Sequence, residues 1–207
     1  MSSIANLIIF RKFRKDMVLF VEGEPGEGLF FVKQGKVKLS KLLPDGRQKI
    51  LNFVREGDIF AEVLLFERGS YPVSAEAMEE CRIGLIRNRD MENLLLEKPQ
   101  LAIKILGVMS RRLRRAQAQN RDLAFQDTYG RLASSLITLA QQFGRKTDQG
   151  VVLELALNQQ DIGNLIGASR ETVARCLADF KKKGLISSKA RTLIIKDMAQ
   201  LKEWGER

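Results

Sequence analysis

The segment from residue 158 to residue 184 is the part of this chain that most constrains its fold. Asn158 can cap a short helix, because Asp161 follows at the spacing of a capping box. Gly167-Ala168-Ser169 then forms a tight turn, and Ser169 can cap a second helix. Apolar residues in the second helix recur at the spacing of one helical face, at Val173, Cys176, Leu177 and Phe180. Two helices joined by a short turn are the helix-turn-helix pattern, for which a helical hairpin with a solvated charged face is the alternative.

The outward face of the second helix has the chemistry of a surface that can enter the major groove of DNA. Arg175 can donate two hydrogen bonds to N7 and O6 of guanine, and Glu171 can accept one from N4 of cytosine. Ala174 and Ala178 keep this face shallow, so the helix can approach base edges closely. We therefore predict a DNA-binding site that consists of Gln160, Ser169, Arg170, Glu171, Thr172, Arg175, Lys182, Lys189 and Arg191.

A basic β-hairpin is predicted to follow the second helix. Gly184 is placed to end that helix. Residues 185–195 then have the pattern of a strand, a basic turn and a second strand, which is typical of a wing. Lys189 and Arg191 in this wing, and the run Lys181-Lys182-Lys183 before it, suit contacts with DNA phosphates, which strengthen binding without reading sequence.

The N-terminal part of the chain, from about Ile8 to Arg87, is a series of short apolar runs separated by glycines. Pro44-Asp45-Gly46 lies between two such runs and predicts a hairpin turn in which glycine supplies a positive φ. Many short strands at regular spacing indicate a small antiparallel sandwich or barrel.

A long helix is predicted to begin at Pro99, and its apolar seam repeats with alternating spacings of four and three residues. Because a lone helix with a narrow apolar stripe needs a partner, a second copy of the chain is the simplest one. The alternative is that the stripe packs on the chain's own sheet, although Ile103, Ile105 and Val108 could serve the sheet from another face. Asn120 in the seam would favour a fixed register. The predicted dimer interface comprises Ala102, Leu106, Met109, Leu113, Ala116, Asn120 and Leu123.

These patterns predict an α+β chain in three parts. We assign residues 1–97 to a strand-rich domain, for which the family resemblance described below implies a sensor role, residues 98–125 to a dimerisation helix, and residues 126–207 to a winged helix-turn-helix domain. Residues 144–150 are expected to form a polar hinge or loop, and residues 151–157 a strand.

The residue composition excludes several kinds of site. The chain has no histidine and only two cysteines, Cys81 and Cys176, so it lacks the usual zinc ligands, a four-cysteine iron–sulfur cluster and a His-ligated haem. We predict no metal and no cofactor, although a haem held by a lone cysteine stays open. Two such separated cysteines are more often buried small residues than a redox pair. Without histidine, and with no evident nucleophile–base pair, an enzyme is not expected.

The net charge of +10 and the isoelectric point near 9.8 favour a polyanionic partner, either nucleic acid or an acidic membrane surface. No apolar run approaches the roughly 20 residues that cross a bilayer. The apolar patch at residues 7–10 precedes its basic residues, which is the reverse of a signal peptide. We therefore expect a cytoplasmic protein that does not bind membranes.

The segments Gln160-Asp161-Ile162-Gly163 and Gly167-Ala168-Ser169-Arg170-Glu171-Thr172-Val173-Ala174-Arg175 closely resemble the helix-turn-helix signature of the bacterial family of the cyclic-AMP receptor protein and the fumarate–nitrate reduction regulator. Glu22-Gly23-Glu24, Gly35-Lys36-Val37, Asp45-Gly46-Arg47 and Gly57-Asp58 resemble its cyclic-nucleotide-binding β-roll (a jelly roll). Leu123-Ala124-Phe125 and Gly130-Arg131 resemble its interdomain segment. The resemblance implies that Arg170, Glu171 and Arg175 of two subunits read a palindromic site with half-sites about one helical turn apart.

The predicted sensor pocket departs from the cyclic-AMP pattern of Gly-Glu followed by Arg-Ser-Ala. Here Ala61-Glu62 and Val73-Ser74-Ala75 occupy those places, so an apolar residue replaces the arginine that would pair with the cyclic phosphate. We therefore expect that cyclic AMP is not the effector, or binds weakly. Glu62 could accept bonds from hydroxyls of another ligand, or be a surface acid near a turn. The candidate effector pocket consists of Ala61, Glu62, Val63, Val73, Ser74, Ala116 and Gln117.

The resemblance leaves several functional alternatives open. The leading hypothesis is a homodimeric transcription regulator that binds double-stranded DNA. An activator of this kind would also contact RNA polymerase, and the family resemblance places that contact at residues 146–150. The alternative is a cyclic-nucleotide-binding module that regulates a protein partner, which would need the missing phosphate-binding arginine. A regulator without any small effector, controlled by its abundance, is the third.

Overall fold

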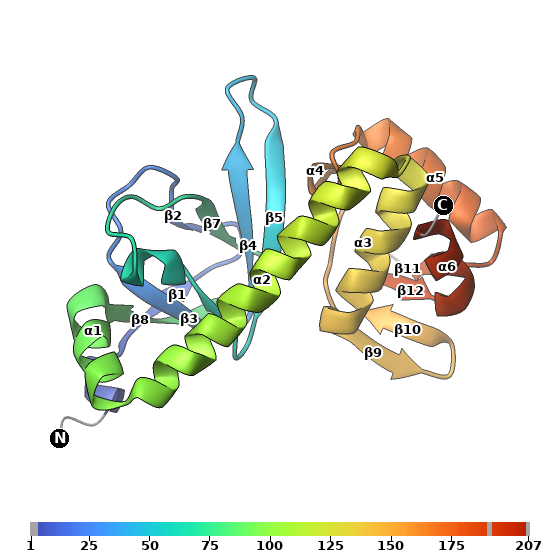
Figure 1. Cartoon of the computed structure of the whole chain (residues 1–207). Helices are drawn as coiled ribbons and strands as arrows, with labels where there is room; N and C mark the ends of the chain where they lie inside the picture. The colour runs from blue at the N-terminus through green and yellow to red at the C-terminus, as the bar shows by residue number, and fades with distance from the viewer. Residues whose placement is uncertain (1–3, 190–191, 206–207) are drawn as a thin grey trace. The chain divides into compact units, whose positions relative to one another are not determined.

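The computed structural model describes residues 4–189 and 192–205, and the chain divides into two compact units, residues 1–111 and residues 112–207. Helix α2 (Pro99–Phe125) begins in the first unit and ends in the second (Figure 1). No helix among the described residues is long and apolar enough to cross a membrane.

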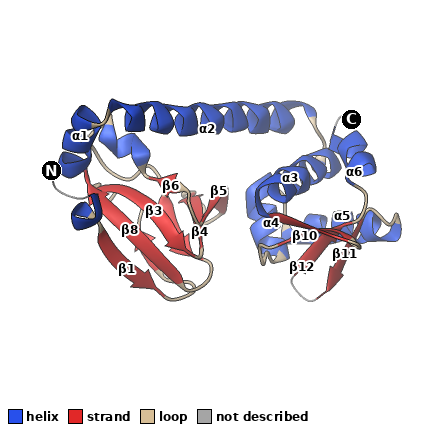
Figure 2. Ribbon diagram, turned by 90° about the horizontal axis from the view of Figure 1, so that it is seen from below, coloured by secondary structure: helices blue, strands red, loops and turns tan. Residues whose placement is uncertain are grey.

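The first unit contains two antiparallel sheets of four strands each (Figure 2). The first sheet has the order β1 (Ile9–Phe13), β8 (Cys81–Arg87), β3 (Gly28–Gln34) and β6 (Ile59–Phe60). The second has the order β2 (Val18–Phe20), β7 (Ser74–Ala77), β4 (Lys36–Leu42) and β5 (Gln48–Arg55). Their buried side chains include Phe20, Phe30 and Phe60, whose rings pack with that of Tyr71 from the segment before β7. The predicted strand-rich part of an α+β fold is thus confirmed.

The predicted hairpin turn at Pro44-Asp45-Gly46 joins β4 to β5. The amide of Leu43 donates to the carbonyl of Arg47 at 2.7 Å, and Gly46 has a φ of 83°. This φ lies in the left-handed region, where a residue without a Cβ is not strained. The hairpin prediction is therefore confirmed, with the glycine in the role that the turn requires.

Both cysteines are buried and free, in agreement with their predicted role as small core residues. Cys81 donates weakly to the carbonyls of Lys36 and Glu79, and burial raises the pKa of its thiol. Gly35 packs closely against it, since a Cβ there would lie 2.6 Å from the sulfur. The turn between β3 and β4 thus needs glycine both for space and for its φ of 92°.

Helix α1 (Asn88–Glu97) and the first half of α2 cover one side of the first sheet. Ile105 packs with Met91 and Leu94 of α1 against residues of β3 and β8, and Leu101 and Met109 pack at the edge of this cluster. The assignment of Ile105 to the chain's own sheet is correct. The same assignment for Ile103 is wrong, because its side chain is 64% exposed.

The second unit contains three further helices after α2, then a C-terminal one. Helix α3 (Thr128–Phe143) packs with α4 (Gln159–Ile166), α5 (Arg170–Lys182) and α6 (Met198–Gly205). A sheet follows the order β11 (Ile186–Lys189), β12 (Thr192–Ile195), β10 (Gly150–Leu153) and β9 (Gly144–Thr147). Two short 3-10 helices in the first unit, η1 (Ile4–Leu7) and η2 (Glu62–Leu65), complete the described elements.

Three expectations for the second unit need correction. Residues 144–150 are not a loop, because β9 pairs with β10 in an antiparallel hairpin. Strand β9 lies at the edge of the sheet and most of its side chains are exposed. Its sequence therefore lacks the alternation of apolar and polar residues by which a strand is predicted. The strand expected over residues 151–157 ends at Leu153. Helix α6 was not expected; its single buried side chain, Leu201, gives a weak periodic signal.

Candidate nucleic-acid interface

Helix α4 begins at a capping box, as the sequence predicts. The side chain of Asn158 accepts from the amide of Asp161 at 2.8 Å, and the carboxylate of Asp161 accepts from the amide of Asn158 at 3.1 Å. Gly167 ends the helix in the left-handed conformation. Gly163 lets the backbone of the turn approach closely, since a Cβ there would lie 2.6 Å from the carbonyl oxygen of Ala168. The turn therefore holds α4 and α5 at close range.

Ser169 caps the N-terminus of helix α5, because its hydroxyl accepts from the amide of Thr172 at 3.2 Å. Val173, Cys176, Leu177 and Phe180 are all buried, which confirms the predicted core face. After Lys183, Gly184 adopts a φ of 73°, as expected at the end of this helix. The helix-turn-helix prediction is thus confirmed in its caps, turn and core face.

The polar part of α5 has two distinct stripes. At about 100° of rotation per residue, Glu171, Arg175, Ala178 and Lys182 lie along one exposed stripe, the outward stripe. Arg170 and Lys181 lie along a second, the wing-side stripe, about 100° away, and the buried Leu177 lies between them at the edge of the core face. The predicted site residues Arg170 and Arg175 therefore occupy different faces of the same helix.

Glu171 is an acceptor that stays ionised at neutral pH. Its own backbone amide and the hydroxyl of Ser169 donate to the carboxylate and hold its pKa below the usual range, and Arg170 adds a smaller attraction. A carboxylate at the first turn of a helix is also favoured by the helix dipole. Glu171 is therefore prepared to accept hydrogen bonds, as the predicted contact with a base requires.

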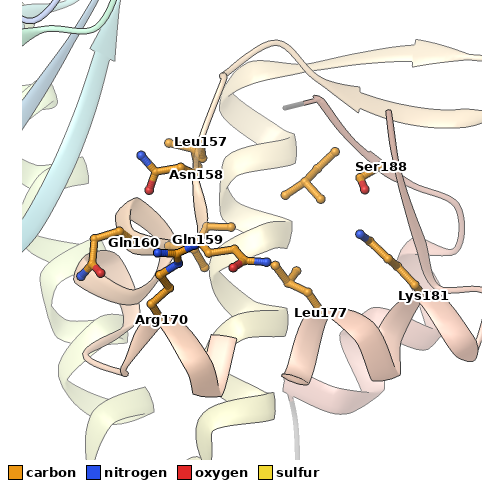
Figure 3. A pocket seen from close by; sticks show the side chains of 10 residues that line it. Leu157, Asn158, Gln159, Gln160, Arg170, Leu177, Lys181 and Ser188 are labelled. Atoms are coloured by element: carbon orange, nitrogen blue, oxygen red, sulfur yellow. The ribbon is translucent and has the colours of Figure 1, made fainter. Parts of the chain in front are cut away.

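A groove of about 590 Å³ lies between the first turn of α4, the wing-side stripe of α5 and the wing strands (Figure 3). It is lined by Leu157, Asn158, Gln159, Gln160, Ile162, Arg170, Leu177, Lys181, Ser188 and Leu193. Two predicted site residues, Gln160 and Arg170, lie here. Lys181, which the sequence analysis assigns with Lys182 and Lys183 to phosphate contacts, also lines this groove, and its spacing of eleven from Arg170 places both on one face of α5.

The predicted wing is present. Strands β11 and β12 pair antiparallel from Ile186↔Ile195 to Lys189↔Thr192. Lys189 is exposed at the end of β11, and the predicted contact Arg191 lies outside the described residues. The wing is thus continuous with β10 and β9 in one sheet, which fixes its base against α3.

Arg131 ties the start of α3 to the helix-turn-helix. Its guanidinium donates to the carbonyls of Ile166 at 3.1 Å and Gln126 at 2.9 Å, and to the hydroxyl of Thr128 at 3.4 Å. Asp127 caps α3 by accepting from the amide of Gly130. The chain between α2 and α3 is therefore bonded directly to the end of α4, one residue before the turn.

Tyr129 connects α3 to α5 through its hydroxyl, which donates to the carboxylate of Asp179 at 2.5 Å. Its ring also contacts Phe180 and Trp204. The bond to Asp179 is the main reason that the pKa of Tyr129 is raised to about 12, because ionisation would place two negative charges together.

We expect this pKa shift to make stability depend on pH at the alkaline end. The folded-state pKa lies above the unfolded value of about 10, so the stabilisation is complete below pH 10 and is lost as the pH rises towards about 12. Thermal unfolding across this range should show a smaller alkaline decrease in Tm for Tyr129→Phe than for the wild type. Burial also raises the pKa of Tyr71, which is present in both proteins. The difference in Tm between wild type and Tyr129→Phe therefore reports on Tyr129 alone. Parallel curves would show that the bond to Asp179 contributes nothing.

The candidate effector residues of the first unit lie at the start of η2 and before or at the start of β7. Ala61 has a left-handed φ of 59°, and Val73 packs against the core. Glu62 is only 3% exposed, so its interpretation as a surface acid is wrong. Ser74 accepts from the amide of Glu22 at 2.9 Å. Of the other predicted pocket residues, Val63 is 37% exposed, and Ala116 and Gln117 are exposed on α2 in the second unit.

The predicted dimer residues lie mostly on exposed parts of α2. Leu106, Leu113 and Leu123 are 57%, 62% and 47% exposed. Ala116 and Asn120 are also exposed, whereas Ala102 and Met109 are half-buried. Leu106 and Leu113, seven residues apart, share one face of α2, and with Leu123 further along the helix they form an apolar row that is exposed in the chain described.

Comparison with known proteins agrees with these features. Residues 10–98 match the family model of a cyclic nucleotide-binding domain, and residues 130–204 that of a Crp-like helix-turn-helix domain. The chain is 37% identical over 191 residues to the CRP-like cAMP-activated global transcriptional regulator of Mycobacterium tuberculosis, covering 91% of this chain and 84% of the relative. It is 34% identical to the anaerobic regulatory protein of Bacillus subtilis, covering 86% of this chain and 75% of the relative.

Two solved structures have a similar fold. A mutant of CooA from Carboxydothermus hydrogenoformans has a TM-score of 0.84 at 29% identity, covering 98% of this chain and 89% of that one. FixK2 from Bradyrhizobium japonicum has a TM-score of 0.84 at 27% identity, covering 95% of this chain and 96% of that one. With its capped helix-turn-helix, its wing and its double-sheet N-terminal unit, this chain belongs to the CRP/FNR family of bacterial transcription regulators and is not an enzyme.

Proposed function

We propose that this protein is a homodimeric regulator that binds a palindromic DNA site through the outward stripe of α5. The observation that carries this proposal is the character of that stripe: Glu171, Arg175 and Lys182 are exposed, and neither cation forms an ion pair with a carboxylate of the described residues. Such cations are available to base edges and phosphates. The net charge of +10 adds a general attraction to DNA.

Electrophoretic shifts of random and palindromic duplexes at several salt concentrations test this proposal. We expect one sequence to be preferred, and the affinity to fall steeply with salt because each phosphate contact contributes roughly −0.9 to the slope of log K against log salt. Binding without preference among sequences would leave only general electrostatic attraction and would contradict the proposal.

Dimerisation is proposed through the exposed apolar row of α2. A free helix would leave Leu106, Leu113 and Leu123 in water, whereas a second copy would bury them. Met109 contributes less, because it already packs at the edge of the first unit's core. The three exposed leucines are positions of the predicted stripe, whereas Leu101, Ile105 and Met109 pack on the helix's own unit.

The effector is proposed not to be cyclic AMP. The supporting residue is Val73, an apolar side chain packed on the core at the position where the cyclic-AMP pattern has its arginine. The relatives do not share one named signal, since one is a cAMP-activated regulator and another an anaerobic regulatory protein. Glu62, buried beside Val63, remains the residue most suited to accept hydrogen bonds from a different ligand.

We expect cyclic AMP to leave the Tm and the DNA affinity unchanged. A ligand that binds the folded state raises stability by RT ln(1 + [L]/Kd), or about 2.7 kcal/mol at a hundredfold excess over Kd, which a thermal-shift series would detect. A concentration-dependent rise in Tm with cyclic AMP, absent with non-cyclic AMP, would show that Val73 does not exclude the cyclic phosphate.

As a regulator that acts on DNA, the protein is proposed to work in the cytoplasm and to contact RNA polymerase. The β9–β10 hairpin is the proposed contact, because its exposed Lys146, Asp148 and Gln149 project from the edge of the sheet opposite to the wing.

A further inference from the structure

We propose that helix α6 fixes the position of α5 relative to the end of α2, with Trp204 as a positioning residue for DNA recognition. This inference rests on the proposed DNA-binding function, and it names a residue that acts through α5 rather than through a contact with DNA. Helix α6 packs beside α3 (Figure 1, Figure 2), and its side chain Leu201 is fully buried. The helix that the sequence patterns did not predict is therefore an integral part of the second unit.

The side chain of Trp204 contacts α5 at two places near the C-terminal end of that helix. Its ring meets the ring of Phe180 edge to face, with the ring centroids 5.6 Å apart. The ammonium group of Lys183 lies over the indole, 5.6 Å from the ring centroid. Tyr129 of α3 completes the cluster, with its ring centroid 5.7 Å from that of Trp204 and 5.9 Å from that of Phe180. Three helices therefore meet in one aromatic cluster, and such ring pairs add stability beyond the area that they bury.

The start of α6 is bonded to the segment that follows α5. The backbone amides of Lys196 and Asp197 donate to the carbonyl of Leu185 at 2.8 and 3.3 Å. The carboxylate of Asp197 also accepts from the amide of Gln200 at 2.9 Å, which caps the first turn of α6. The helix therefore has a fixed beginning one residue beyond Gly184, where α5 has just ended.

The end of α6 is bonded to the connection between α2 and α3. The side-chain amide of Gln126 donates to the carbonyl of Gly205, and its nitrogen lies 3.3 Å from the hydroxyl oxygen of Ser134. The carbonyl of Gln126 accepts from Arg131, whose guanidinium also donates to the end of α4. Little space is left here, because a Cβ on Gly205 would lie 2.8 Å from the hydroxyl oxygen of Ser134. Gln126 is thus held by α6 through its side chain and by Arg131 through its backbone.

Trp204 supports α5 at the end far from the helix-turn-helix turn. The near end is held by the cap at Ser169, and Phe180 follows eleven residues later, about 16 Å along the helix axis. Arg175 lies between the two supports, about 9 Å from the cap. A tilt of about 5° around the turn would move the backbone of Arg175 by roughly 0.8 Å. Since a binding group must be held within about 0.5 Å of its productive position, support at the far end decides whether Arg175 meets its base.

A palindromic site adds a second requirement on the position of α5. Two such helices read half-sites one helical turn apart only when they lie about 34 Å from each other. Each α5 must therefore keep one position relative to the α2 helix through which the proposed dimer forms. Helix α6 contacts both sides of this connection, since Trp204 packs on α5 and Gly205 bonds to the residue that follows α2.

The affinities of the full-length protein for the preferred duplex and for a scrambled duplex, measured at one salt concentration, test the role of Trp204. For Trp204→Ala we expect the affinity for the preferred duplex to fall on the order of 10-fold, because the ring contacts that hold the far end of α5 are lost. The affinity for the scrambled duplex should change by less than about 2-fold, because non-specific binding depends on charges that the variant retains. Trp204→Phe keeps a ring in the cluster and should restore most of the preference.

Two further variants complete the design. Gln126→Ala removes the bond to the end of α6 from a half-buried side chain, and it should lower the preference in the same direction by a smaller factor. Phe66→Ala is the control, because it removes a ring that is 53% exposed in the first unit. We expect this control to leave both affinities unchanged.

The two duplexes separate a positioning role from a merely structural one. A variant that is only less stable contains less active protein and loses the same factor of affinity on both duplexes. Such an equal loss for Trp204→Ala, or full retention of the preference, would overturn the inference and leave DNA recognition intact. If Trp204→Ala does not fold, wild-type preference in Gln126→Ala would overturn it. Absence of any sequence preference in the wild type would instead reject the proposed function.

Discussion

Replacing Arg175 by alanine is expected to lower the preference for the cognate duplex over a scrambled one by on the order of 10- to 100-fold per half-site. A bidentate arginine–guanine contact provides about 1–3 kcal/mol of discrimination, and Arg175 lies exposed on the outward stripe without a carboxylate partner among the described residues. Fluorescence anisotropy with both duplexes at one fixed salt concentration measures the ratio of affinities. Folding should be unaffected, because the side chain is not in the core.

Arg145→Ala is the matched control for this experiment. Arg145 is an exposed arginine of the same unit, but it lies on β9 and pairs with Glu154 at 2.6 Å. We expect this variant to retain the full sequence preference. Equal preference in wild type and Arg175→Ala would mean that the outward stripe of α5 does not read bases.

The substitution Leu113→Glu is expected to convert the dimer to a monomer. Leu113 is 62% exposed in the chain described, so a glutamate there should change the folding stability of an isolated subunit little. In a dimer, two glutamates would face each other across the paired helices, away from water, which is strongly unfavourable. Two linked DNA-binding domains bind a palindrome on the order of 10²- to 10⁴-fold more tightly than one, because the second binds at a high effective concentration. A monomer should therefore lose a large part of its affinity for a palindrome. Analytical ultracentrifugation and anisotropy measure the two effects.

Leu96→Glu provides the comparison, because Leu96 is 82% exposed on α1 and outside the predicted seam. This variant should remain dimeric and bind DNA like the wild type. A dimeric Leu113→Glu protein would place the interface elsewhere on the molecule.

Local sequence signals predicted the helix-turn-helix well because each of its features depends on residues close in the chain. The capping box of Asn158 and Asp161, the left-handed Gly167 and the cap at Ser169 are all interactions within a few residues. The apolar spacing from Val173 to Phe180 likewise predicted the buried face of α5. The same reasoning predicted the β4–β5 turn at Gly46.

Features that depend on tertiary contacts were predicted less well. The edge strand β9 has no apolar alternation to detect, since its stability comes from pairing with β10. Ile103 was assigned to the wrong side of α2, and Met109 packs partly on its own unit, because the packing of α1 and β3 decides which face of α2 is covered. The burial of Glu62 follows from the left-handed turn at Ala61, which no residue type in that segment demands.

The groove with Lys181 could have been found from the sequence only in part. Its spacing from Arg170 places the two on one helical face, but the approach of the wing and of the first turn of α4 completes the groove. Long-range proximity of this kind is not contained in a local pattern.

Selection of bound duplexes from a random pool by the wild-type protein tests the central claim most directly, because α5 in a twofold-symmetric dimer should read the same bases twice. We expect an enriched sequence with two inverted half-sites whose centres lie about 10–10.5 base pairs apart. Enrichment of no sequence, or of a sequence without twofold symmetry, would contradict it.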